Sequence, residues 1–240
     1  MTFCAFFVQS SEIFISSGVD SMSQTERKHN DEQDIAPLHA SRINKDIVQF
    51  FTSPVPDIML CPDANNILVS HAIIIGPDKT PYEGGFFYFY IKLPHDYPFS
   101  PPTVKLMTTD QNRVRFNPNL YACGRVCLSI LNTWSGPQWS PGNTLMGVLL
   151  SIQSVLNEEP YKNEPGASSL PHRCTDPVAQ YNKIILHETI RVAISYYEQV
   201  ITSNLCRDGH QMKDPFNQPR GKFQYKQLLV EFNKLKGKYS

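Results

Sequence analysis

The stretch FNPNLYACGRVCLSIL, residues 116–131, places a cysteine between a rigid turn and an apolar run. Asn117-Pro118-Asn119 forms the turn, since proline fixes its own φ angle and asparagine side chains bond readily to nearby main chain. Cys127 follows this turn and a glycine, and it precedes the largely apolar run 128–131. The pattern indicates a thiol held at a fixed distance from an amide side chain.

The length of 240 residues allows one domain of about 150 residues with a substantial core, together with tails. Lysine and arginine together number 22, as do aspartate and glutamate, so no bulk field attracts nucleic acid or an anionic membrane. No run reaches the roughly 20 apolar residues that a membrane span needs. The N-terminal runs FCAFFV and IFIS are interrupted by polar residues and lack the basic start of a secretory signal. We therefore expect neither nucleic acid nor a membrane as a partner.

Six cysteines are scattered along the chain: Cys4, Cys61, Cys123, Cys127, Cys174 and Cys206. They form no CxxC pair and no cysteine and histidine spacing that would hold zinc, so no metal site is expected. A disulfide between Cys123 and Cys127 stays open as an alternative, although no second close pair supports a disulfide framework. Reduced thiols are expected, which favours a cytoplasmic and nuclear location.

Residues 1–36 are expected to form a flexible leader, because the polar stretch 16–36 has too little apolar surface to offset the entropy of ordering. An amphipathic helix then begins at Pro37 and ends before Ser53, with Phe50 and Phe51 among its apolar positions. Arg42 and Lys45 lie on another face of this helix. That face is either simply solvated or a surface for a partner.

Short strands follow the helix. Ile67–Ile75 is rich in β-branched residues, a turn-forming segment separates it from the aromatic run Phe86–Ile91, and Thr103–Met107 supplies a further strand. These segments predict an antiparallel meander. His71 alternates with apolar neighbours, so it is expected to be a sheet residue and not a ligand.

Helices close the sequence. Asn143 is the expected N-cap of a core helix that carries Leu145, Leu149, Ile152 and Leu156. Asp176-Pro177 begins a long helix, and the tail from Asp214 is expected to end in a short basic helix. Because the strands and the helices are segregated along the chain, the fold class is α+β.

Six motifs in a fixed order resemble the ubiquitin-conjugating (E2) enzyme family: PYEGG, DYPFSPPTVKLMT, FNPN, GRVCLSIL, WSP and LLSIQSVL. The resemblance implies the UBC fold, a four-stranded antiparallel meander with flanking helices. It covers residues 37–166 as a core domain. Residues 167–240 would then be a C-terminal helical extension packed on that core.

The resemblance also implies site residues. Cys127 matches the cysteine that accepts the C-terminal glycine of ubiquitin from an activating enzyme (E1) as a thioester and yields it to a lysine amine. Asn119 matches the amide that supports the oxyanion. Glu164 matches an acidic gate residue that could orient the lysine, with Asn163 as its rival.

Partner surfaces follow from the same matching. Phe99, Pro141 and Gly142 fall where the family contacts its ligases (E3), and Arg42 and Lys45 fall where it meets the E1. The implied partners are ubiquitin or a ubiquitin-like modifier, an E1, E3 ligases and protein substrates. The alternative ubiquitin-activating enzyme is one candidate for the E1. No cofactor is expected, because ATP is consumed upstream by the activating enzyme.

The sequence departs from the family pattern at three places. Asn117 replaces the usual histidine of the turn, Ser129 stands where an acidic residue is common two positions after the cysteine, and Gly142 stands where alanine is common. Two rival functions stay open: an E2-like scaffold that is never charged, and a thiol hydrolase in which His172 or His187 reaches Cys127. The transfer function requires a sulfur that is reachable from solvent and an Asn119 side chain close to it.

Overall fold

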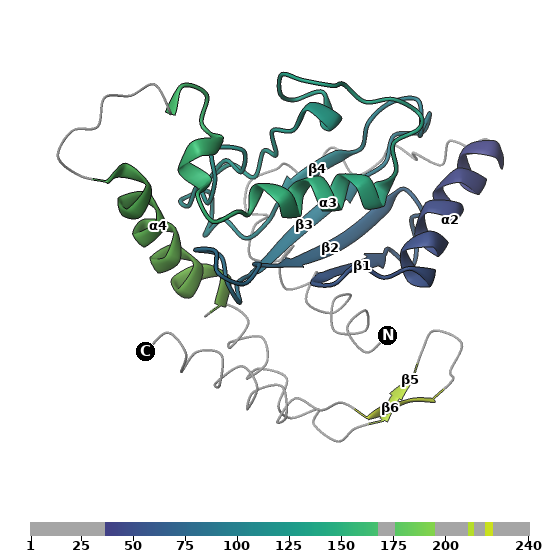
Figure 1. Ribbon diagram of the computed structural model, residues 1–240. Helices are drawn as coiled ribbons and strands as arrows, with labels where there is room; N and C mark the ends of the chain where they lie inside the picture. Colours follow the sequence, from purple (N-terminus) through teal and green to yellow (C-terminus); the bar gives the residue numbers. More distant parts are fainter. Residues whose placement is uncertain (1–36, 168–175, 195–210, 214–218, 223–240) are drawn as a thin grey trace, which may run out of the picture.

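A four-stranded antiparallel sheet forms the centre of the computed structural model, and its strands lie in chain order (Figure 1). The structure describes residues 37–167, 176–194, 211–213 and 219–222. The strands are β1 (Ile58–Pro62), β2 (Val69–Ile75), β3 (Phe86–Lys92) and β4 (Thr103–Leu106). The predicted meander is therefore confirmed. The predicted leader, residues 1–36, and the basic helix of the tail lie outside the described residues.

Strand β1 was not identified from the sequence. Its five residues, IMLCP, show no strict alternation of buried and exposed positions, and it ends in a proline. It pairs with β2, with Leu60 opposite Ala72. A short apolar run cannot be told from a helix segment by periodicity alone, so pairing with β2 decided its conformation.

Helix α2 (Pro37–Thr52) confirms the predicted amphipathic helix. Ile43 and Phe50 are buried in the core, but Phe51 is exposed, so its expected place on the apolar face is wrong. Each helical residue turns the side chain by about 100°, which carries Phe51 off the stripe that holds Ile43 and Phe50.

Helix α3 (Leu145–Val155) lies across one face of the sheet (Figure 1) and buries its apolar side there. Its N-cap is Thr144, whose side chain accepts a hydrogen bond from the Gly147 amide. The prediction of Asn143 as the cap is wrong by one residue. The Asn143 carboxamide instead accepts from the Ser140 amide at 2.7 Å and so closes the loop before the helix.

Two further helical segments complete the described fold. Helix α4 (Pro177–Glu188) is capped by Asp176 as predicted, and it continues into a π-helical turn, η4 (Thr189–Ile194). Short 3-10 turns occupy Ser129–Leu131 (η1) and Pro160–Asn163 (η2), and β5 (Gln211–Lys213) pairs with β6 (Pro219–Lys222). No helix within the described ranges is long and apolar enough to span a bilayer.

Candidate active site

A tight hairpin carries Cys127. Leu120 and Val126 form a β-bridge, and the Cys127 amide donates to the Asn119 carbonyl at 2.8 Å. Gly124 turns the chain with φ +86°, and a Cβ there would lie 2.5 Å from the Leu106 carbonyl oxygen. Only glycine therefore allows the hairpin to approach β4 this closely.

Asn117 anchors the turn that precedes the hairpin. Its buried carboxamide accepts from the Asn119 amide at 2.9 Å and donates to the Tyr82 hydroxyl at 2.8 Å and to the Val155 carbonyl at 2.7 Å. The turn is thereby bonded to the loop before β3 and to the end of α3. An asparagine at this position serves as a structural amide with all its polar atoms in use.

Asn119 points back at the hairpin. Its side-chain Nδ2 donates to the Cys127 carbonyl oxygen at 2.8 Å. The expected proximity of the two residues is therefore present. In this arrangement the amide group stabilises the main chain beside the sulfur, and its hydrogen-bonding capacity is partly occupied.

The Cys127 side chain is more enclosed than expected. Only 2% of the residue's surface is exposed, so the expectation of a sulfur reachable from solvent is wrong for this conformation. The Cys127 amide pairs with the Asn119 carbonyl, and the residues on either side, Val126 and Leu128, pack in the core, so the main chain around the cysteine is held close to the protein. Burial raises the pKa of the thiol, and the positive charges of Arg125 and Arg115 offset part of that rise.

Arg115 joins the turn to the opposite loop. Its guanidinium donates to the Pro118 carbonyl at 2.8 Å and to the Asn117 carbonyl at 3.3 Å, and it lies 4.3 Å from the centre of the Tyr121 ring. Its Nη2 also reaches the Glu164 carboxylate at 3.3 Å. Arg115 therefore links the segment that carries Asn119 with the segment that carries the predicted gate residue.

The two candidate gate residues have different surroundings. Asn163 accepts from Asn157 at 2.9 Å and donates to the Val155 carbonyl at 3.1 Å, so its carboxamide is engaged in holding η2 against α3. Glu164 is exposed and has Arg115 as its ion-pair partner. Of the two, Glu164 has the exposed side chain, which could reach an incoming group once it separates from Arg115.

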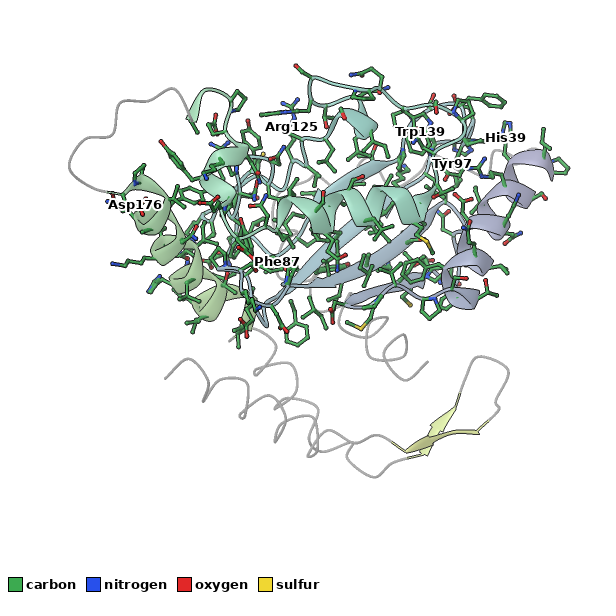
Figure 2. The ribbon with its side chains drawn as sticks, in the orientation of Figure 1. His39, Phe87, Tyr97, Arg125, Trp139 and Asp176 are labelled. Atoms are coloured by element: carbon green, nitrogen blue, oxygen red, sulfur yellow. The ribbon has the colours of Figure 1, made fainter. Side chains whose placement is uncertain are left out.

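The predicted ligase-binding residues lie on the surface. Phe99 is 61% exposed, and Pro141 and Gly142 are exposed as well. Figure 2 shows Tyr97 and Trp139 close together beside His39 at the start of α2, and the Trp139 indole donates to the Pro98 carbonyl at 2.7 Å. The loop that carries Phe99 is thus held against the loop that precedes α3.

The two residues predicted to bind the E1 differ. Lys45 is exposed, whereas Arg42 is half-buried and bonded within the protein. Arg42 donates to Asp46 at 2.9 Å, to the Pro141 carbonyl at 3.0 Å and to the Asn143 carbonyl at 2.7 Å. Arg42 therefore holds the Pro141–Asn143 loop in place.

Sequence reasoning missed three residues of this region. Asp46, 4% exposed, accepts from the Tyr97 hydroxyl and from the Leu145 amide as well as from Arg42. The i, i+4 spacing of Arg42 and Asp46 on a helix was the available signal. Arg115 lies two residues before Asn117 and Arg125 two residues before Cys127, but nothing local in the sequence distinguishes them from solvated arginines.

The structure also bears on the hydrolase alternative. His187 is exposed and bonds to Glu188 at 3.0 Å, and His172 lies outside the described residues. Within the described part of the chain, no hydrogen bond joins an imidazole to Cys127. The same described residues include no cluster of three or more histidine, cysteine or acidic side chains that could hold a metal ion.

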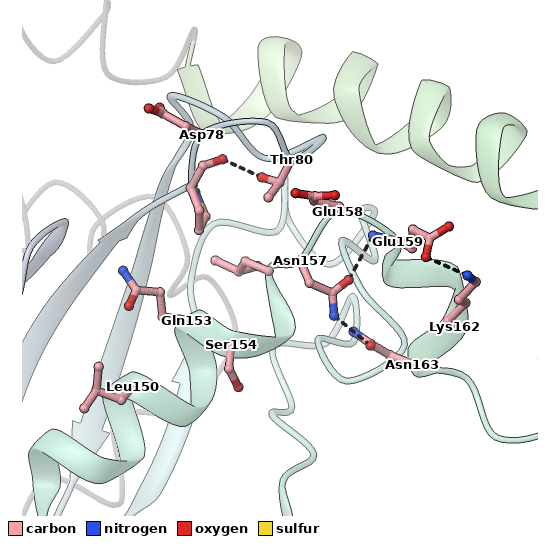
Figure 3. Close-up of a pocket in the computed structure, with 12 residues that line it drawn as sticks. Asp78, Thr80, Leu150, Gln153, Ser154, Asn157, Glu158, Glu159, Lys162 and Asn163 are labelled. Carbon is pink, nitrogen blue, oxygen red and sulfur yellow. Dashed lines mark hydrogen bonds and ion pairs between the residues drawn. The ribbon is translucent and has the colours of Figure 1, made fainter.

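A wide hollow of about 920 Å³ lies at the end of α3 (Figure 3). Four of its polar side chains are paired with each other, Lys162 with Glu159 at 2.6 Å and Asn157 with Asn163 at 2.9 Å. Neither Cys127 nor Asn119 lines it. This hollow is therefore not a candidate for the chemistry of the hairpin.

The meander, the Asn117-Pro118-Asn119 turn and the cysteine hairpin define a known class of protein. A family model for ubiquitin-conjugating enzymes matches residues 42–189, and the chain belongs to the ubiquitin-conjugating enzyme family. The UBC fold and the enzyme class expected from the sequence are therefore confirmed.

Within the family, the chain is similar to ubiquitin-conjugating enzyme E2 Z. It is 44% identical over 214 residues to the Xenopus tropicalis protein, covering 78% of this chain and 68% of that protein. It is 42% identical over 234 residues to the Homo sapiens protein, covering 87% and 66%. A probable ubiquitin-conjugating enzyme protein 17 from Caenorhabditis elegans is 41% identical over 162 residues, covering 62% and 22%. The chain thus spans about two thirds of the length of its E2 Z relatives.

Proposed function

We propose that Cys127 accepts ubiquitin or a ubiquitin-like modifier from an E1 as a thioester and transfers it to a lysine amine of a protein substrate, usually with an E3. The observation that supports this most is the pairing of Asn119 with Cys127, which brings a carboxamide next to the cysteine. The family membership of the chain supports the same reaction.

The first step is thioester exchange. The Cys127 thiolate attacks the carbonyl carbon of the modifier, a new C–S bond forms, the C–S bond to the E1 breaks, and the E1 cysteine leaves as a thiolate. A thiol with an ordinary pKa near 8.5 is only a few per cent ionised at neutral pH but is strongly nucleophilic as the thiolate. This step therefore depends on positioning more than on a strong base.

The second step is aminolysis. The neutral lysine nitrogen attacks the thioester carbonyl carbon, a C–N bond forms, the C–S bond to Cys127 breaks, and Cys127 leaves as a thiolate. Asn119 releases the Cys127 carbonyl and donates to the developing oxyanion, and Glu164 orients the amine and accepts its proton after separating from Arg115. The chain uses no cofactor of its own in this scheme, because the E1 has already consumed ATP.

Burial of the thiol adds one requirement. Because Cys127 is 2% exposed, the hairpin has to open before the E1 thioester can reach the sulfur. The hairpin tip is suited to such a motion, since Cys123 and Arg125 are exposed there. Contact with the E1 is the event that would open it.

The partner surfaces are assigned by the same proposal. The E1, including the alternative ubiquitin-activating enzyme, binds the face of α2 that carries Lys45, and E3 ligases bind Phe99, Pro141 and Gly142. Arg42 connects these two surfaces, because it lies on α2 and holds the Pro141–Asn143 loop. The protein would act in the cytoplasm and the nucleus.

A charging assay tests the proposal. The purified chain, an E1, ATP and ubiquitin should give an adduct that a reducing thiol removes; Cys127→Ala should give none, and Cys127→Ser should trap an oxyester that resists the thiol. Cys123→Ser is the matched control, because this exposed cysteine is four residues away, and it should charge normally. An adduct on Cys127→Ala would refute the site. If neither the usual nor the alternative ubiquitin-activating enzyme gives an adduct, with ubiquitin or with a ubiquitin-like modifier, the result would instead favour the uncharged scaffold.

A further inference from the structure

Two cationic side chains face each other beside the hairpin. Lys105 of β4 and Arg125 form an antiparallel β-bridge, and both residues are exposed. Like charges directly opposite each other destabilise a strand pair. Neither residue has an ion-pair partner in the part of the chain that the structure describes, whereas Arg115 is paired with Glu164.

The two cations line a hollow of about 360 Å³ together with Val126, the residue that precedes Cys127. Thr103, Thr133, Pro101 and Pro102 also line it. Gly124 leaves room for the aliphatic part of the Lys105 side chain, since a Cβ at position 124 would lie 2.8 Å from Lys105 Cγ. Arg125 lies two residues before Cys127 in the chain. Burial raises the pKa of the Cys127 thiol, and the positive charge of Arg125 offsets part of that rise. Figure 2 shows Arg125 well apart from the Tyr97 and Trp139 cluster.

We infer that this hollow binds an acidic residue of the acceptor protein, next to the lysine that receives the modifier. The inference rests on the proposed function and adds a substrate class to it: lysines flanked by aspartate or glutamate. An extended chain spans about 3.3 Å per residue. Residues a few positions away from a lysine that attacks the thioester at Cys127 would therefore be able to reach the hollow. A carboxylate there would pair with Lys105 and Arg125 and relieve their mutual repulsion.

The acceptor fits this site better than the other partners. The proposed E1 surface on α2 and the Tyr97 and Trp139 cluster lie apart from Arg125 (Figure 2), although Pro101 and Pro102 of the hollow follow Phe99 in the same loop. The site also lacks the acidic residue that is common two positions after the cysteine, where this chain has Ser129. The surroundings of the thiol are therefore cationic on the side of the hollow.

The test is single-turnover discharge of the ubiquitin-charged 240-residue chain onto peptides that contain one lysine and differ only in its two flanking residues. With flanking glutamates the second-order rate constant should be about fivefold higher than with glutamines, as expected for exposed charge pairs, and salt should reduce the difference. Lys105→Glu should abolish this preference and favour a peptide with flanking arginines. Lys183→Glu, the same change at an exposed lysine of α4, should keep the original preference.

Each outcome is decisive. Equal rates with glutamate and glutamine peptides overturn the inference but leave the proposed function intact, because discharge still occurs. If Lys105→Glu slows charging, or slows discharge onto free lysine as much as onto the peptides, the cations serve the modifier or the E1 and the inference is wrong. A failure of the wild-type chain to form any thioester overturns the proposed function itself, and the inference with it. If Lys105→Glu does not fold, Lys105→Gln takes its place. Loss of the preference for glutamate peptides in Lys105→Gln supports the inference, and an unchanged preference overturns it.

Discussion

Asn119 has one amide group and two possible acceptors. In the structure its Nδ2 bonds to the Cys127 carbonyl at 2.8 Å, and in the proposed aminolysis the acceptor is an oxyanion on the modifier. The bond to the carbonyl keeps the amide within reach of the sulfur, so a structural role and a catalytic role can follow from the same position.

Replacing Asn119 by alanine separates the two roles. We predict that Asn119→Ala still accepts ubiquitin but discharges it to free lysine about 10²-fold more slowly, the loss typical of removing one oxyanion donor. Single-turnover discharge measures the rate. Asn44→Ala, at an exposed amide on α2, should discharge like the wild type. Equal rates for Asn119→Ala and wild type would remove the oxyanion role.

The buried thiol has a pH signature. Burial raises the pKa of Cys127, so the reactive thiolate is scarce at neutral pH. We predict that a small alkylating reagent modifies Cys127 more slowly than the exposed Cys123, and that the Cys127 rate keeps rising through pH 8.5, the ordinary value of a cysteine. Peptide mapping by mass spectrometry reports the two sites separately. A Cys127 rate that levels off near neutral pH would contradict the buried state.

At the scale of secondary-structure elements, a single carboxylate connects α2, the loop with Phe99 and the start of α3. Asp46 accepts from Arg42, from the Tyr97 hydroxyl and from the Leu145 amide. Arg42 in turn donates to the loop before α3, through the Pro141 carbonyl. The helix proposed for the E1 and the loops proposed for the ligases are therefore held in one arrangement.

Loss of this carboxylate should be costly. We predict that Asp46→Ala lowers the free energy of unfolding by about 2–4 kcal/mol, because buried donors on Tyr97 and Leu145 lose their acceptor. Urea denaturation measures the change. Lys45→Ala, at an exposed neighbour on the same helix, should stay within about 0.5 kcal/mol of wild type. A similar effect of the two substitutions would show that the network contributes little to stability.

At the scale of the whole molecule, α4 and η4 are each attached to the core by a polar contact. Asn182 donates to the Glu158 carbonyl at 2.8 Å, and Arg191 pairs with Asp110 at 2.9 Å. The family match extends through residue 189, into the segment that the sequence analysis assigns to the extension. The boundary at residue 166 stays a prediction.

The attachment should weaken in acid. A hydrogen bond from Arg191 holds the pKa of the Asp110 carboxyl below its ordinary value, so its contribution is full above about pH 4 and is lost as the pH falls through the lowered pKa. We predict that Asp110→Asn reduces amide exchange protection of residues 177–194 about two- to fivefold at pH 7 and removes the acid dependence of that protection. Asp78→Asn, at an exposed aspartate, is the control. Unchanged protection in Asp110→Asn would show that other contacts hold the helix.

Much of the fold and part of the site could be predicted from the sequence. The strands β2 and β3 follow from β-branched and aromatic runs, and the caps and prolines that bound α2 and α4 act within a few residues. The β1 strand and the place of Phe51 could not be predicted, because pairing with β2 and packing in the core decide them.

The sequence by itself determined the family, the order of the elements and the closeness of Asn119 to Cys127, since these depend on local turns and on motifs in a fixed order. Only the tertiary structure decided that Cys127 is enclosed, that Arg42 holds a loop 99 residues away, and that Arg115 reaches Glu164 across 49 residues. The physical reason is that burial and long-range ion pairs depend on how distant segments pack, and local periodicity carries no information about distant segments.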